Sequence, residues 1–114
     1  MGCMDTLKSA DVIIADFPGV TGIKRRAVVV ISTADYHTTV GDVILGAVTT
    51  NLIIATTPTD HLIVDWTETG LRRPSAFRSF LVTLPQSKVL AVIGSLSSAD
   101  WQKVQACIRK AITV

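Results

Sequence analysis

The 114-residue chain lacks the residue patterns of metal sites and disulfide frameworks. Its two cysteines, Cys3 and Cys107, are not spaced as a metal-binding pair. Cys107 falls on the apolar side of a predicted helix, which indicates a small core residue in a reduced protein. Neither His-Glu-x-x-His nor Cys-x-x-Cys occurs. The sequence therefore predicts no metal site and no cofactor.

Long hydrophobic runs are also missing. Apolar residues make up 48% of the chain and the mean hydropathy is +0.46, yet no apolar run approaches the roughly 20 residues that span a bilayer. We therefore expect no membrane segment, and the excess apolar surface predicts a homodimer or another covering partner.

The N-terminal residues lack the basic region and apolar stretch of a signal peptide, so we expect a cytoplasmic protein. Gly2 and Cys3 match a loose lipidation pattern, which leaves a membrane-anchored adaptor as an alternative. A leader without regular structure is the preferred interpretation of this segment.

Motifs of the common hydrolases are absent as well. There is no Gly-x-Ser-x-Gly elbow, and no Gly-rich phosphate loop precedes a Lys-Ser or Lys-Thr pair. His37 and His61 leave a Ser-His-Asp triad open, but no motif surrounds either of them. Conventional acid–base enzymes are therefore poorly supported.

Positive charge is absent from the middle of the chain, since residues 27–70 hold no Lys or Arg. The basic residues gather at Lys24-Arg25-Arg26, at Arg72-Arg73 with Arg78 and Lys88, and near the C-terminus. Two separated clusters of this kind can converge into one anion-binding surface. Ordinary solvated loops are the alternative.

What the chain does contain is a series of short β-branched runs, separated mostly by Gly, Pro, Asp or Thr. This pattern is typical of a mainly β barrel or sandwich, here a single domain over residues 1–114. Runs 27–31 and 89–93 do not alternate and are expected to be covered on both faces. The predicted strands cover residues 11–16, 27–33, 42–50, 51–56, 61–66, 76–84 and 88–93.

One amphipathic helix is predicted at the C-terminal end. Ser97 and Ser98 are candidate caps, and Asp100 follows Ser97 at the spacing of a capping box. Apolar residues from Trp101 to Ile112 then recur at helical spacing. We expect this helix to pack on the barrel and close it.

The first hairpin holds the best candidate site. A loop with two glycines follows Phe17, and Lys24-Arg25-Arg26 leads directly into a buried strand. A guanidinium at the root of a rigid strand is well positioned to stabilise negative charge on a reacting phosphate. Thr49 and Thr50 end a later strand and can donate hydroxyl hydrogen bonds to phosphate oxygens.

At these residues the chain resembles the MazF/PemK family of toxins. The shared pieces come in the family's order and cover nearly the whole chain. They are Asp11-Val-Ile-Ile-Ala-Asp-Phe17, Lys24-Arg25-Arg26-Ala27 before an apolar strand, Ala47-Val48-Thr49-Thr50, Pro74-Ser75-Ala76-Phe77, Thr83-Leu84-Pro85, and Ile93-Gly94-x-Leu96-Ser97 before a helix. The family's proline after the arginine is Ala27 here, and Ser79-Phe80-Leu81 replaces a stretch that often holds an acid or amide.

The resemblance implies an SH3-like antiparallel barrel with a C-terminal helix, of the MazF/PemK/CcdB type. It implies a homodimeric, metal-independent endoribonuclease that cleaves single-stranded RNA and is neutralised by a cognate antitoxin. Arg26 and Thr49 would be catalytic, and Phe17, Lys24, Arg25 and Thr50 would bind RNA.

Besides the structural or membrane-anchored adaptor, two alternatives stay open. One is a non-catalytic module of the same fold that binds RNA or gyrase. In the other, Arg26 pairs with Asp16 or Asp35 at the surface, and Thr49 and Thr50 are ordinary strand residues.

Overall fold

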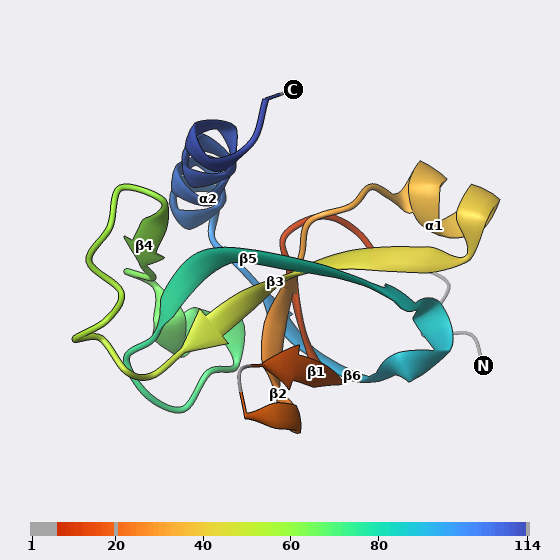
Figure 1. Cartoon of the computed structure of the whole chain (residues 1–114), viewed down its shortest axis with the longest axis horizontal. Helices are drawn as coiled ribbons and strands as arrows, with labels where there is room; N and C mark the ends of the chain where they lie inside the picture. Colours follow the sequence, from red (N-terminus) through yellow and green to blue (C-terminus); the bar gives the residue numbers. More distant parts are fainter. Residues whose placement is uncertain (1–6, 20, 114) are drawn as a thin grey trace.

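The computed structural model describes residues 7–19 and 21–113, and the Gly2-Cys3 lipidation pattern lies outside them. The chain forms a six-stranded sheet in the order β4-β5-β3-β2-β1-β6, in which every pair is antiparallel. Figure 1 shows this sheet with one helix at each side. The elements are β1 (Asp11–Gly19), β2 (Gly22–Val30), α1 (Ala34–Val40), β3 (Asp42–Thr49), β4 (Asp60–Leu62), the 3-10 helix η2 (Trp66–Thr69), β5 (Ala76–Pro85), the 3-10 helix η3 (Gln86–Lys88), β6 (Val89–Ser95) and α2 (Ser98–Ala111).

The sheet buries apolar side chains on both faces. Val28 and Val30 of β2 belong to one core cluster, whereas Val29 belongs to another, because successive residues of a strand point to opposite faces. The expectation that residues 27–31 are covered on both faces is thus confirmed for this central run. The mainly β class with a C-terminal helix is confirmed too.

Closure into a barrel is not observed in the described part of the chain. β4 and β6 are the two ends of the strand order and do not pair with each other. β4 has only three residues, and α2 lies against it and β5 instead. The helix therefore covers one end of the sheet without completing a ring of hydrogen bonds (Figure 1).

The C-terminal helix begins where the capping pattern predicts. The Ser97 hydroxyl accepts a hydrogen bond from the backbone N–H of Asp100 and donates one to its carboxylate, both at 3.2 Å. Val104, Cys107 and Ile108 then pack into the second core cluster, as the apolar stripe indicates. No described helix has the length and apolar character needed to cross a membrane.

Two predicted strands are wrong. Residues 51–56 form turns, because the Thr49 hydroxyl accepts from Asn51 N–H and the Asn51 side chain accepts from Ile53 N–H. Such local side-chain bonds compete with strand pairing. The strand expected at 61–66 is limited to β4, after which the chain turns into η2.

Two further differences concern a missed helix and an edge strand. α1 was not predicted, although Thr33 caps its start and Gly41 ends it at φ 85°, a conformation that favours glycine. β6 was expected to be covered on both faces, yet Leu90 and Val92 are each 44% exposed. Apolar runs alone do not reveal that a strand lies at the edge of its sheet.

Candidate functional site

The β1–β2 hairpin positions Arg26 at the end of the first core cluster. Arg26 pairs with Ala15 across the hairpin and lies on the same face of β2 as the buried Val28. β2 and β3 pair at Val28 and Ala47. Extending this register by two residues brings Arg26 opposite Thr49, beyond the last paired residues.

Two pockets meet at this point, with volumes of about 420 and 570 Å³. Arg26, Val48 and Thr49 line both of them. The two residues predicted to be catalytic therefore lie together in the wall that the pockets share. This convergence needs the sheet register, since Arg26 and Thr49 come from different strands.

The Arg26 guanidinium is incompletely satisfied. Its Nε atom is buried and has no hydrogen-bond partner, the only such side-chain nitrogen or oxygen among the described residues. A buried polar group without a partner costs free energy unless a ligand or solvent completes its hydrogen bonding. Arg26 forms no ion pair with Asp16 or Asp35 in the described structure.

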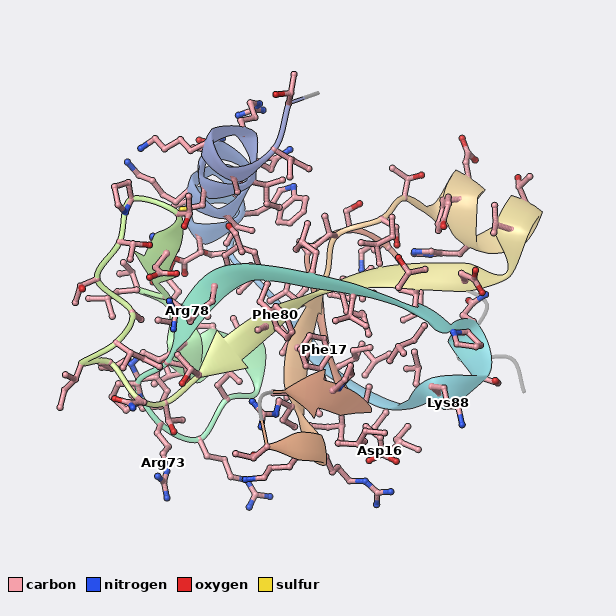
Figure 2. The ribbon with its side chains drawn as sticks, viewed as in Figure 1. Asp16, Phe17, Arg73, Arg78, Phe80 and Lys88 are labelled. Atoms are coloured by element: carbon pink, nitrogen blue, oxygen red, sulfur yellow. The ribbon has the colours of Figure 1, made fainter. Side chains whose placement is uncertain are left out.

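The smaller pocket combines aromatic and charged groups. The rings of Phe17 and Phe80 meet edge to face with centroids 5.7 Å apart. Phe17 is buried and Phe80 is 50% exposed, so Phe80 presents its ring to a ligand. Figure 2 shows both rings in the middle of the molecule, with Arg78 to one side. Aromatic faces of this kind can stack on the bases of single-stranded RNA.

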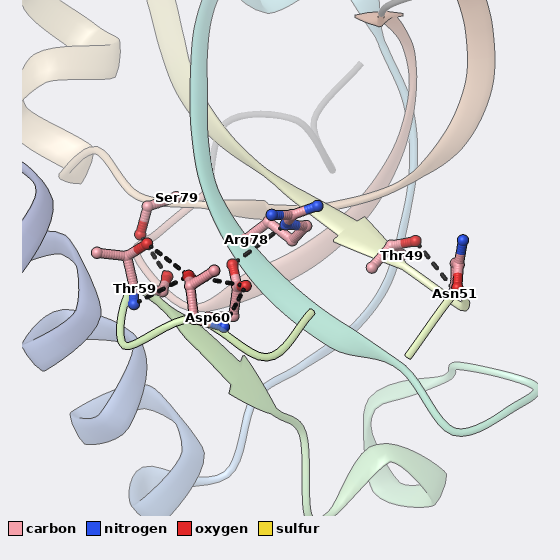
Figure 3. A network of polar contacts seen from close by, with 7 residues as sticks. Thr49, Asn51, Thr59, Asp60, Arg78 and Ser79 are labelled. Carbon is pink, nitrogen blue, oxygen red and sulfur yellow. Dashed lines mark hydrogen bonds and ion pairs between the residues drawn. The ribbon is translucent and has the colours of Figure 1, made fainter. Parts of the chain in front are cut away.

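A polar network holds Arg78 in this pocket (Figure 3). Arg78 Nε donates to Asp60 Oδ1 at 3.1 Å, and the Asp60 side chain is only 2% exposed. Asp60 Oδ2 accepts from the Thr57 N–H and hydroxyl at 3.1 and 2.9 Å. The Ser79 hydroxyl donates to the Thr59 carbonyl at 2.8 Å. These bonds tie the loop before β4 to β5 and fix the Arg78 side chain.

The larger pocket is more cationic. Arg72 and Arg73 line it together with Arg26, and Thr50 adds a hydroxyl beside that of Thr49. No carboxylate is among the lining residues. The structure thus brings Arg26 together with three members of the second basic cluster, Arg72 and Arg73 here and Arg78 in the smaller pocket.

Lys24 and Arg25 line neither pocket. Both are exposed, and Arg25 donates to Asp16 through Nε at 3.0 Å and Nη2 at 3.4 Å. This hydrogen bond and the guanidinium charge lower the pKa of Asp16. The ion pair with Asp16 considered for Arg26 is therefore formed by its neighbour. An exposed pair of this kind contributes little to stability and is easily exchanged for a phosphate.

Neither histidine belongs to a Ser-His-Asp triad in the described residues. Buried His37 lies 3.1 Å from the Leu7 carbonyl through Nδ1 and 2.6 Å from the Ser32 hydroxyl through Nε2. The Leu7 carbonyl can only accept, so His37 Nδ1 donates to it, and Nε2 shares the other hydrogen bond with the Ser32 hydroxyl. His61 Nε2 contacts Asp100 instead, at 2.7 Å. Both histidines link distant segments.

Sequence reasoning missed Asp60, Phe80 and Ser79 as pocket residues. Arg72, Arg73 and Arg78 were noted only as a basic cluster that could converge on the first. No local motif marks these positions, because two strand pairings bring them to Arg26. In β3–β5 Arg78 lies opposite Ala47, and in β4–β5 Asp60 lies opposite Arg78.

The fold and the two pockets define a class, a small mainly β protein whose adjoining pockets are lined by arginines and aromatic rings. A family model for the PemK-like, MazF-like toxins of type II toxin–antitoxin systems matches residues 8–112. The chain belongs to this family.

Solved structures share the fold. An endoribonuclease in complex with its cognate antitoxin from a mycobacterial species superposes with a TM-score of 0.74 at 16% identity, covering 93% of this chain and 94% of that chain. The Mycobacterium tuberculosis toxin MazF-mt6 superposes with a TM-score of 0.72 at 22% identity, covering 89% of this chain and 94% of that chain. MazF from Deinococcus radiodurans superposes with a TM-score of 0.76 at 14% identity, covering 95% of this chain and 97% of that chain. No curated protein sequence matches the chain.

Proposed function

We propose that this toxin is an endoribonuclease that cleaves single-stranded messenger RNA without a metal ion. The observation that carries the proposal is the meeting of Arg26 and Thr49 in the wall shared by the two pockets. The buried, unpartnered Nε of Arg26 adds to it, because a phosphate oxygen would supply the missing acceptor.

The reaction is an internal transesterification. The 2'-hydroxyl oxygen attacks the adjacent phosphorus, and the bond from phosphorus to the 5'-oxygen breaks. The 2'-hydroxyl proton passes to solvent and the leaving oxygen gains one, which gives a 2',3'-cyclic phosphate and a 5'-hydroxyl.

Arg26 stabilises the negative charge that builds on the phosphorane, and Thr49 donates a hydrogen bond to one of its oxygens. A permanently cationic guanidinium suits this role better than that of a base.

The other predicted residues bind the RNA chain. Phe17 supports the exposed Phe80 ring, on which a base stacks. Thr50 contacts phosphate from the larger pocket. Lys24 and Arg25, at the exposed start of β2, attract the backbone through charge.

The active form is a homodimer that acts in the cytoplasm. A cognate antitoxin would inhibit it by laying an extended segment over the same pockets. Two solved complexes of similar proteins support this partner, the mycobacterial endoribonuclease with its cognate antitoxin and the MazE–MazF complex of Deinococcus radiodurans.

The chemistry is tested with purified protein and a natural RNA. Cleavage should continue in excess EDTA, and sequencing of the cut ends should find 2',3'-cyclic phosphate and 5'-hydroxyl termini. A substrate with one 2'-deoxy sugar immediately 5' of the scissile phosphate should bind and remain intact, since phosphate contacts carry no sugar information.

Loss of cleavage in EDTA, or a 5'-phosphate product from the deoxy substrate, would contradict the mechanism. Binding of RNA or gyrase without any cleavage would favour the non-catalytic alternative.

A further inference from the structure

The loop between η2 and β5 carries two cations whose role the proposed chemistry does not include. Arg72 and Arg73 are both exposed, and both line the larger pocket beside Arg26. Neither forms an ion pair within residues 7–19 and 21–113. Figure 2 shows Arg73 at the rim of the molecule, away from the Arg78 network.

The loop that carries these arginines is held in place at both ends. Gly70 has φ +82° and its backbone lies directly against the Ile93 carbonyl, where a side chain would collide. Leu71 packs against the second core cluster. At the other end, the Ser75 hydroxyl donates to the Arg73 carbonyl at 2.8 Å, and Ile63 N–H donates to the Ser75 carbonyl at 2.9 Å. The two guanidinium groups therefore project from a fixed backbone.

The chemistry of the two pockets differs. The smaller one holds aromatic rings and the Asp60 carboxylate, which would repel an anion if Arg78 did not neutralise it. The larger one holds three arginines, the hydroxyl groups of Thr49 and Thr50, and no carboxylate. Guanidinium and hydroxyl donors without a competing acid are suited to phosphate oxygens.

We propose that Arg72 and Arg73 form a subsite for a phosphodiester next to the one that is cleaved. The inference rests on the proposed function, because the polyanion is taken to be RNA. Arg26 and Thr49 belong to both pockets, so a strand whose scissile phosphate lies at Arg26 continues into the larger pocket. A contact there positions the strand along the site without reading its bases.

The experiment measures binding on a single-stranded DNA oligonucleotide with the sequence of the cleaved RNA, which cannot be cut by 2'-hydroxyl attack. If the protein cuts no RNA, a DNA oligonucleotide of mixed sequence serves as the probe. Fluorescence anisotropy measures Kd at several KCl concentrations from about 50 to 200 mM. The proteins compared are wild type, Arg72→Ala and Arg73→Ala. Arg109→Ala, on the exposed side of α2, is the matched control.

Each loop variant should weaken binding several-fold and lower the slope of log Kd against log salt by about 0.7. Arg109→Ala should leave the affinity and the salt slope unchanged. Wild-type affinity and slope in both loop variants would overturn the subsite.

A second measurement locates the phosphate. Neutral methylphosphonate linkages are placed one at a time along the oligonucleotide. A neutral linkage at one position beside the cleavage site should weaken binding by the wild-type protein. The same linkage should have no further effect on binding by the Arg72→Ala/Arg73→Ala double variant. Equal losses in wild type and double variant at every position would also overturn the subsite.

The two proposals fail separately. Arginine-dependent binding without RNA cleavage would overturn the endoribonuclease and leave Arg72 and Arg73 as a phosphodiester-binding site alone. Cleavage by wild type together with unchanged binding in both loop variants would overturn the subsite alone.

Discussion

Arg26 and Asp100 represent two opposite ways of burying charge in this protein. The Arg26 guanidinium keeps a buried Nε without a partner beside two pockets. Asp100 is 1% exposed and accepts hydrogen bonds from His61, the Val64 and Asp65 N–H groups and the Ser97 hydroxyl. An unsatisfied buried group is typical of a site awaiting a ligand, whereas a fully satisfied one holds segments together.

Replacing Arg26 by alanine should therefore affect catalysis far more than stability. We expect Arg26→Ala to lower the cleavage rate by about 10²–10³-fold or more, because it removes a donor to the developing phosphorane charge. The free energy of unfolding should change by less than about 1 kcal/mol, since no protein hydrogen bond of Nε is lost. Single-turnover cleavage and urea unfolding measure the two effects. Similar cleavage rates for wild type and variant would refute the assignment.

Asp100→Asn should instead affect stability far more than catalysis. Burial alone would raise the pKa of Asp100, but hydrogen bonds from Val64, Asp65 and His61 outweigh it and lower the pKa below the ordinary 3.8. A lowered folded-state pKa means that the carboxylate stabilises the fold above about pH 3.8 and that this contribution is lost as pH falls below that value. At pH 7 the variant should unfold about 1–3 kcal/mol more easily.

Urea unfolding from pH 7 down to pH 3 checks this prediction. The gap between wild type and Asp100→Asn should narrow as the solution becomes more acidic than pH 3.8. Asp16→Asn is the control, because the pKa of Asp16 is also lowered but its partner Arg25 is exposed. A gap that stays constant down to pH 3 would contradict the role given to the Asp100 charge.

At the scale of elements, α2 depends on its first turn. The helix starts at Ser98, and Ser97 satisfies the Asp100 N–H that would otherwise lack an intrahelical acceptor. Asp100 also links this turn to the segment after β4, so the start of the helix and the end of the sheet are one hydrogen-bonded unit.

Ser97→Ala should lower the free energy of unfolding by about 1 kcal/mol, the usual effect of losing an N-cap side chain. Ser98→Ala is the matched control, since Ser98 is exposed within the helix and caps nothing. It should change stability by no more than about 0.5 kcal/mol. Thermal or urea unfolding measures the stability of both variants. Equal losses of stability would show that Ser97 is not the cap.

At the scale of the whole molecule, the apolar surface is larger than one chain covers. Large apolar side chains stay exposed on several elements, including Leu62 on the β4 edge and Leu90 and Val92 on the β6 edge. Such surfaces are typical of proteins that associate. The same chain gathers cations from β2, β5 and the 72–73 loop around one position.

We expect a homodimer of two 12.2 kDa chains in solution, related by a two-fold axis that places each basic hairpin beside a shared groove. Sedimentation equilibrium at micromolar concentration should give twice the chain mass. High salt should leave the dimer intact if apolar contacts dominate it. A monomer at these concentrations would count against the prediction.

Most of the strands and the C-terminal helix could be predicted from local patterns in the sequence. β-branched runs predicted β1, β3, β5 and β6 close to their observed positions, and the Ser97–Asp100 spacing predicted the start of α2. The run at 27–33 predicted only the second half of β2, which already begins at Gly22. These features depend on neighbours within a few residues, which is the range that periodicity and capping describe. The guanidinium and hydroxyl candidates Arg26 and Thr49 also came from local context, next to the buried apolar runs of β2 and β3.

The surroundings of Arg26 and Thr49 depend on contacts between strands that are distant in the sequence. The β2–β3 and β3–β5 registers bring Thr49 and Arg78 to Arg26, and the packing of Gly70 on β6 fixes the loop that adds Arg72. β4 and β6 do not pair with each other in the described sheet, where a closed barrel was expected. Each of these outcomes depends on pairing between residues far apart in the chain. A register shift of one residue would turn every side chain to the other face, and local patterns do not specify that register.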